Sequence, residues 1–172
     1  MKFQYNDGGR AASGFKGTAG DCVCRSIAIA TGLPYKEVYD LINSEGGKER
    51  KGKRKRGVSN ARTGVYKNTI RNVMARLGWK WVPTMGIGTG CTVHLADGEL
   101  PMGRLVVNVS KHTTAVIDGV IHDTHNPSDR ATTIYPLHTP KHELPKGATL
   151  LENGNGYAYS PNRCVYGYFI KP

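Results

Sequence analysis

Three residues of the chain have the types and the order of a thiol catalyst. Cys22 lies near the N-terminus, and His112 and Asp123 follow in the second half of the chain. Thiol catalysis requires a cysteine of low pKa, an imidazole that exchanges protons with it, and a third group that orients the imidazole. We therefore expect Cys22, His112 and Asp123 to form a catalytic triad.

The Asp118-Gly119 pair is the strongest hairpin signal in the chain, because it lies between two apolar runs. A two-residue turn at this pair fixes the register, with Ile117 opposite Val120. His112 and Asp123 then become diagonal neighbours on one face, with their Cβ atoms roughly 7 Å apart. The residues expected on that face are His112, Thr114, Val116, Ile121, Asp123 and His125.

Cys22 is expected in the first turn of a helix that starts at Thr18–Asp21, continues over residues 22–31 and ends at Gly32. Thr18 and Asp21 form a pattern that resembles a capping box before this helix. A thiol in the first turn lies near unpaired backbone N–H groups and the positive end of the helix dipole, which both stabilise a thiolate. Cys24 falls on a more interior turn, so we favour Cys22 as the nucleophile.

The remaining pattern predicts an α+β fold in a single domain over 1–172, with helices first and an antiparallel sheet second. Residues 1–17 look like an irregular lead-in, and residues 127–161 look like a long excursion rich in proline and glycine. Two further helices are expected, from Pro34 to Gly46 and from about 64 to 77. The expected strands are 79–82, 91–95, 105–110, the two strands of the hairpin, and 163–169.

Composition narrows the setting in which the protein works. The chain has 172 residues, 38% of them hydrophobic, with no apolar run long enough to span a membrane and no signal-peptide stretch at the N-terminus. We therefore expect a cytoplasmic protein without a membrane partner. In a reducing compartment its four cysteines would be free thiols. No cofactor is expected, and the Cys-x-Cys spacing has no second pair with which to form a structural zinc site.

The formal net charge of +11 is concentrated in one segment, where seven of the nine residues from Lys48 to Arg56 are basic. Such a block repels itself, so we expect a mobile basic loop at 46–62. It either contacts nucleic-acid phosphates or another acidic surface, or keeps the protein soluble as a solvated loop. The residues expected to make such contacts are Lys51, Lys53, Arg54, Lys55 and Arg56.

A cysteine at a helix start, followed by helices and then by a strand-borne histidine and an acid, resembles the papain-like cysteine peptidase superfamily. The pattern is most similar to small bacteriocin-leader peptidase-like domains, in which the third residue is aspartate. Part of the chain also resembles small uncharacterised proteins of bacteriophage genomes. The stretches that carry this second resemblance are Gly20–Cys22, Gly103–Val107, His112–Gly119 and Val165–Tyr168.

The resemblance implies that Cys22 is the nucleophile, His112 the general acid and base, and Asp123 the orienting group. It implies a thioester acyl-enzyme, a peptide or protein substrate, and a phage-encoded protein in a bacterial cytoplasm. Asn126 is an alternative third member. Members of the superfamily often carry a glutamine about six residues before the cysteine as an oxyanion donor, and this chain has Lys16 there.

Two other classes of function remain open on the sequence alone. His112, Asp123 and His125 would make a metal site of two histidines and one carboxylate, which needs no cysteine. A non-catalytic interaction protein would instead bind nucleic acid or a host protein through the basic loop. The oligomeric state is not indicated by any pattern in the chain.

Overall fold

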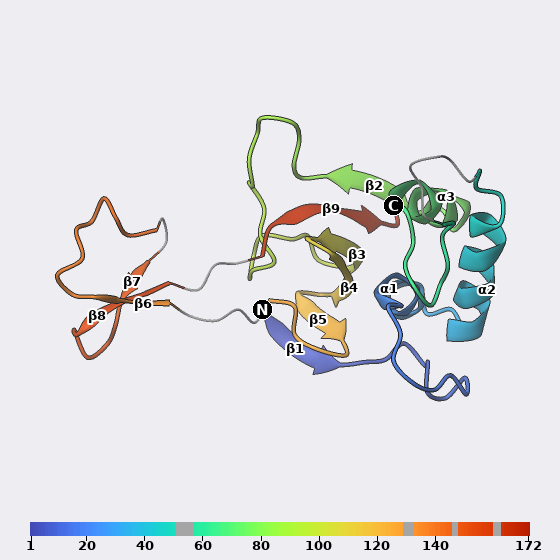
Figure 1. Cartoon of the computed structure of the whole chain (residues 1–172), viewed down its shortest axis with the longest axis horizontal. Coiled ribbons are helices and arrows are strands. Elements are labelled where there is room, and N and C mark those ends of the chain that lie inside the picture. The colour runs from blue at the N-terminus through green and yellow to red at the C-terminus, as the bar shows by residue number, and fades with distance from the viewer. Residues whose placement is uncertain (51–56, 129–132, 146–147, 160–162) are drawn as a thin grey trace.

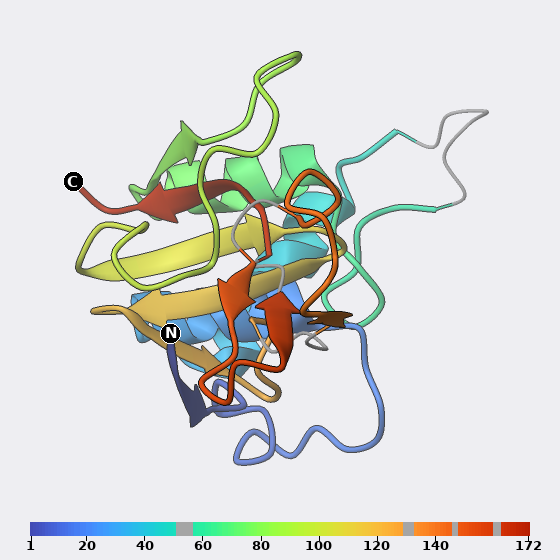
Figure 2. The same ribbon diagram turned by 90° about the vertical axis from the view of Figure 1, so that its left-hand side faces the viewer.

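The computed structural model describes residues 1–50, 57–128, 133–145, 148–159 and 163–172. Within these ranges the chain is an α+β protein, with three helices packed on one side of a mixed six-stranded sheet (Figure 1). The turned view in Figure 2 also places the helices on one side of this sheet. A second, three-stranded sheet stands to one side of the main body.

The three helices have the bounds α1 Cys22–Thr31, α2 Tyr35–Gly46 and α3 Lys67–Arg76. Gly32 ends α1 because it adopts the left-handed conformation, with φ of 76°. Polar contacts fix α1 on the sheet. Ser26 Oγ donates a hydrogen bond to the carbonyl oxygen of Thr113 at 2.8 Å, and Arg104 Nε donates one to the carbonyl oxygen of Ala30 at 2.6 Å.

The strands of the main sheet follow the order β1-β5-β4-β3-β9-β2. Neighbouring strands run antiparallel, except that β1 pairs with β5 in parallel. The bounds are β1 Lys2–Tyr5, β2 Lys80–Pro83, β3 Arg104–Val109, β4 His112–Ile117, β5 Val120–Asp123 and β9 Val165–Ile170.

The central strands are buried on both faces. Val106 and Ala115 pack with the helices in one core cluster, whereas Leu105 and Val116 pack on the opposite face with Leu95 from the connection before β3. Burial on both faces explains why β3 and β4 contain consecutive apolar residues rather than a strict alternation. The two clusters hold β4, and with it His112, in a fixed position above α1.

Several expectations about local structure need correction. The lead-in is not wholly irregular, because β1 joins the sheet and makes it mixed rather than antiparallel. Thr18 does not cap α1. The N-cap residue is Asp21, whose side chain makes no capping hydrogen bond. Of the strand expected at 91–95, the described residues retain one isolated bridge, between His94 and Cys164.

The four cysteines are not all free thiols. Cys91 and Cys164 form a disulfide, with their Cα atoms 5.8 Å apart, and Cys22 and Cys24 remain free. The disulfide ties the connection between β2 and β3 to the start of β9. The expectation of four free thiols is therefore wrong for this pair.

The excursion expected at 127–161 contains the second sheet, with the order β6-β8-β7 and the bounds β6 Thr133–Pro136, β7 Thr149–Leu150 and β8 Gly156–Tyr159. In the segment expected as a basic loop, residues 57–62 pack against the helices. Ser59 is buried, and its backbone packs closely on the end of α2. A Cβ added to Gly46 would lie 2.2 Å from the Ser59 carbonyl oxygen. No helix in the described ranges has both the length and the apolar character to cross a bilayer.

Candidate active site

The structure brings the three residues expected to form a triad together at the junction of α1 and the main sheet. Cys22 is the first residue of α1, His112 is the first of β4, and Asp123 is the last of β5. His112 Nε2 lies 2.7 Å from Asp123 Oδ2, and the imidazole lies close enough to the Cys22 thiol to lower the pKa of that thiol. Because Nε2 is engaged by the carboxylate, Nδ1 is the ring nitrogen left for the thiol.

The hairpin has the register expected from its turn. Ile117 pairs with Val120 and Val116 with Ile121, and the two turn residues have positive φ, 47° at Asp118 and 76° at Gly119. Positive φ at both central residues is the geometry of a type I′ turn, which fits the right-handed twist of the strands. This register makes His112 and Asp123 diagonal neighbours whose side chains meet.

The electrostatics favour an ion pair between Cys22 and His112. Burial of the Cys22 thiol raises its pKa, but the hydrogen bond to His112 and the charge of the imidazolium outweigh burial and leave the pKa below its ordinary value. Burial alone would lower the pKa of His112. The interactions with Asp123 and Cys22 outweigh burial and raise the pKa to about 9. A thiolate beside an imidazolium is the reactive form of a cysteine nucleophile.

Asp123 is buried and held as a carboxylate. Burial raises its pKa, but the hydrogen bond and charge of His112, together with the backbone N–H of Thr124, bring the pKa below its ordinary value. The Thr124 N–H lies 2.7 Å from Asp123 Oδ1. Arg25 Nη2 lies 3.9 Å from the same oxygen. These contacts fix the carboxylate that orients the His112 ring.

Asp21 precedes the nucleophile but does not oppose the thiolate as an unpaired charge. Its buried carboxylate forms ion pairs with Arg25 and with Arg10, whose Nε lies 3.0 Å from Oδ2. Tyr35 donates a hydrogen bond to Oδ2 at 2.7 Å. Arg25 therefore lies between two carboxylates, and its charge also lowers the pKa of Cys22.

The residues kept as alternatives have other environments. Cys24 is fully buried, and burial raises its pKa to about 12, which makes it an unreactive thiol. Asn126 Oδ1 accepts hydrogen bonds from the backbone N–H and the hydroxyl of Ser128. His125 stacks near His112, with the ring centroids 4.8 Å apart. The nitrogen and carboxylate atoms of His112, Asp123 and His125 lie within 4.8 Å of one another.

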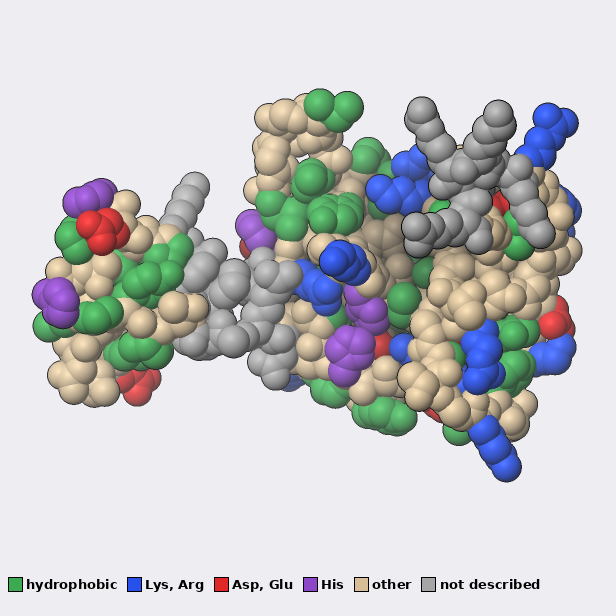
Figure 3. Space-filling model, in the orientation of Figure 1, with side chains coloured by type: hydrophobic (Ala, Val, Ile, Leu, Met, Phe, Trp, Pro, Cys, Tyr) green, Lys and Arg blue, Asp and Glu red, His purple; other side chains and the backbone are tan. Residues whose placement is uncertain are grey.

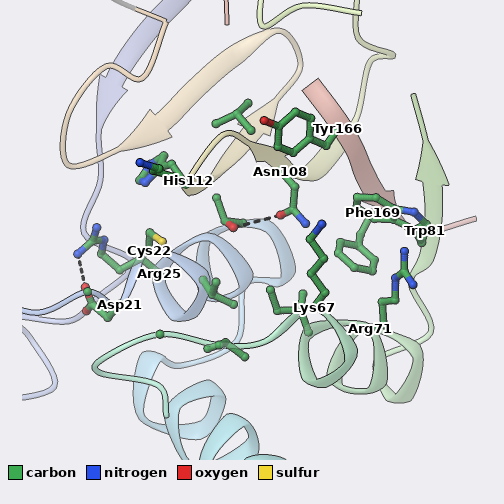
Figure 4. Close-up of a pocket in the computed structure, with 18 of the residues that line it drawn as sticks. Asp21, Cys22, Arg25, Lys67, Arg71, Trp81, Asn108, His112, Tyr166 and Phe169 are labelled. Carbon is green, nitrogen blue, oxygen red and sulfur yellow. Dashed lines mark hydrogen bonds and ion pairs between the residues drawn. The ribbon is translucent and has the colours of Figure 1, made fainter. Parts of the chain in front are cut away.

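A cavity of about 910 Å³ opens beside the thiol. Figure 4 shows Cys22 and His112 at one end of it and Trp81, Phe169 and Arg71 at the other, with Lys67 extending between them. Its walls come from α1, from α3 and the loop before it, from β2 and β9, and from β3 and β4. On the face in Figure 3, histidine, lysine and arginine side chains gather around the middle of the main body. An extended ligand can therefore reach the thiol.

The position of the usual oxyanion donor is not occupied by a comparable group. Lys16 is exposed, and its carbonyl oxygen accepts hydrogen bonds from the side chains of Arg10 and Arg62. It does not line the cavity. The backbone N–H groups of the first turn of α1 have no intrahelical acceptor and surround Cys22, so they are the donors nearest to a tetrahedral intermediate.

Sequence reasoning missed Arg25 and Arg10 as parts of this site. Arg25 carried a local signal, since it lies one helical turn after Asp21 and forms an (i, i+4) ion pair with it. Arg10 had no such signal, because its approach to Asp21 depends on the path of the loop after β1. The basic residues Lys51, Lys53, Arg54, Lys55 and Arg56 lie outside the described residues.

No protein-family model matches the chain, and no curated protein or solved structure does so either.

Proposed function

We propose that this protein is a cysteine hydrolase of the papain-like type, which cleaves an amide or related acyl bond through Cys22, His112 and Asp123. The observation that carries the proposal is the placement of Cys22 beside His112, whose imidazole is in turn held by Asp123 through a 2.7 Å hydrogen bond. The order of elements, with the cysteine at a helix start and the histidine on a later sheet strand, also supports a papain-like assignment.

In the proposed reaction the Cys22 thiolate attacks the carbonyl carbon of the substrate and forms a C–S bond. The N–H groups at the start of α1 stabilise the oxyanion. His112 gives its proton to the leaving amine as the C–N bond breaks, which leaves a thioester on Cys22. A water then gives a proton to neutral His112 and attacks the thioester, and the acid product leaves as the thiolate forms again. An amine in place of water would give acyl transfer.

A small activated ester tests this chemistry without knowledge of the natural substrate. Acylation of Cys22 by p-nitrophenyl acetate releases p-nitrophenolate in a burst of one equivalent per enzyme. We expect the Cys22→Ala variant to lose the burst and the Cys24→Ala variant to keep it, because Cys24 is buried and its pKa is raised. Mass spectrometry should locate the acetyl group on Cys22. Equal acetylation of both thiols, or no burst in the wild-type protein, would contradict the proposal.

A metal site is the second candidate, because His112, Asp123 and His125 lie close enough to share one ion. The hydrogen bond between His112 Nε2 and Asp123 Oδ2 argues for the thiol reaction first, since a shared ion would take the place of that proton. The two candidates differ in their need for the thiol. Hydrolysis retained in the Cys22→Ala variant and lost in a chelator would favour the metal site.

A further inference from the structure

We infer that the end of the cavity away from the thiol binds a carboxylate of the substrate next to an apolar side chain, so that acidic peptides are the preferred substrates. This inference rests on the proposed hydrolase function, because it concerns what the same cavity selects. The groups that carry it are Lys67 and Arg71 on α3, Lys111 beside the start of β4, and the aromatic pair Trp81 and Phe169.

The cations of the cavity differ in whether a protein carboxylate already neutralises them. Arg25 forms ion pairs with Asp21 and Asp123. In contrast, no carboxylate of the described residues lies within ion-pair distance of Lys67, Arg71 or Lys111. Lys67 and Arg71 are one helical turn apart, so both reach the cavity from the same face of α3.

The carboxylate that lines the cavity is already paired with cations of the protein. Asp21 is the sole carboxylate among the described residues that line the cavity, and it is buried against Arg10, Arg25 and Tyr35. A ligand therefore meets uncompensated positive charge. Arginine and lysine form their strongest hydrogen bonds with carboxylates and similar anions, and a lowered dielectric inside a cavity strengthens them.

The aromatic residues next to these cations supply the apolar part of the subsite. The rings of Trp81 and Phe169 have centroids 4.8 Å apart, and the Arg71 guanidinium lies 5.6 Å from the centroid of the Trp81 ring. Gly167 makes room for the indole, because a Cβ there would lie 2.3 Å from a carbon of the Trp81 ring. Figure 4 shows Arg71 beside Trp81, with the Lys67 amine pointing toward the centre of the cavity. A phenylalanine or leucine side chain on this aromatic surface would place an adjacent carboxylate among the cations.

Calorimetric titration of the intact Cys22→Ala variant measures this selectivity without any turnover. One blocked peptide carries a phenylalanine followed by two glutamates, and its match carries two glutamines. A third peptide ends in a phenylalanine with a free carboxylate, which distinguishes a terminal carboxylate from a side-chain one. We expect one of the two acids to bind at least about tenfold more tightly than the glutamine peptide, with the preference falling as salt rises.

Charge removal then assigns the preference to the cavity. Adding Lys67→Gln and Arg71→Gln should abolish the preference for acid, whereas the matched pair Lys2→Gln and Lys141→Gln, which are exposed and outside the cavity, should leave it unchanged. Equal binding of acidic and glutamine peptides, or an equal loss in both double variants, would overturn the inference. The ester burst of the wild-type protein is scored separately, so a failure of the thiol chemistry cannot be mistaken for a failure of this subsite.

Discussion

His112 Nε2 and Asp123 Oδ2 lie 2.7 Å apart, which assigns the two nitrogens of the imidazole to different partners. Nε2 binds the carboxylate, and Nδ1 remains for the Cys22 thiol. The ring cannot turn over without breaking a hydrogen bond to a buried charge. The carboxylate therefore determines both the orientation of His112 and its affinity for a proton.

Replacing Asp123 tests this orienting role. Asp123→Asn keeps the shape of the side chain but removes the charge that holds the His112 proton, so the pKa of His112 should fall. We expect the rate of ester acylation at pH 7 to drop by about 100-fold or more. Stopped-flow detection of p-nitrophenolate measures the rate. Asp118→Asn, in the turn at the opposite end of the hairpin, is the control and should change the rate little. Similar rates in Asp123→Asn and the wild-type protein would show that the carboxylate does not orient the ring.

The pH profile of thiol alkylation follows from the directions of the two pKa shifts. The pKa of Cys22 is lowered and that of His112 is raised to about 9, so the ion pair persists from the lowered pKa of the thiol up to about pH 9. Iodoacetamide at pH 6 should modify Cys22 well before Cys24, as read by peptide mass spectrometry. Cys22 alkylation that starts only near the ordinary thiol pKa of 9.0 would contradict this profile.

The same shift makes the contribution of His112 to stability depend on pH. Its folded-state pKa lies above the ordinary histidine pKa of 6.5, so the stabilisation from the bound proton is complete below about pH 6.5 and is lost as the pH rises through about 9. Urea unfolding of the wild-type protein and His112→Ala should therefore give the largest difference near pH 6. A difference that grows toward pH 10 would have the wrong sign.

Asp21 should matter for stability more than an exposed carboxylate does. Asp21→Ala leaves the Arg10 and Arg25 guanidiniums beside a buried gap, and we expect it to lower the free energy of unfolding by about 3–5 kcal/mol. Asp40→Ala, which removes an exposed ion pair with Lys36, should cost less than about 1 kcal/mol. Urea denaturation measures both. Equal costs would mean that the ion pairs of Asp21 are not buried in solution.

The disulfide predicts a stability difference that depends on a reductant. Cys91 and Cys164 are 73 residues apart in sequence, so Cys164→Ser should lower the free energy of unfolding by about 2–4 kcal/mol without reductant. In dithiothreitol the variant and the wild-type protein should converge. Counting of free thiols in the unreduced, unfolded wild-type protein provides the check, since four reactive thiols would show that the bond does not form.

The parts of the site that could be predicted from the sequence depend on local geometry. The Asp118-Gly119 turn sets the register of its own hairpin, so the meeting of His112 and Asp123 follows from a few residues. The body and the end of α1 were similarly predictable, because an apolar pattern fills its length and Gly32 marks its end, but its N-cap is Asp21 and not Thr18. Each of these signals lies within one element or one turn.

The features that the sequence did not indicate depend on distant parts of the chain. β1 is four exposed residues long, which gives no burial pattern to read. The pairing of Cys91 with Cys164 cannot be read from spacing alone. Arg10 reaches Asp21 through a loop, and the cations of α3 reach the cavity through the packing of that helix. Chain topology, rather than local preference, brings these groups together.

The hydrogen bond from Ser26 to the Thr113 carbonyl joins residues 87 positions apart, so the docking of α1 on β4 requires both halves of the chain to be present. Until that docking, Cys22 is an ordinary thiol on an isolated helix, because the imidazole that lowers its pKa belongs to a strand that the ribosome delivers ninety residues later. While the chain is being synthesised, the pKa of Cys22 is therefore not lowered by His112. If the proposed thiol chemistry holds, reactivity toward acyl groups arises together with the native state rather than with the synthesis of the cysteine.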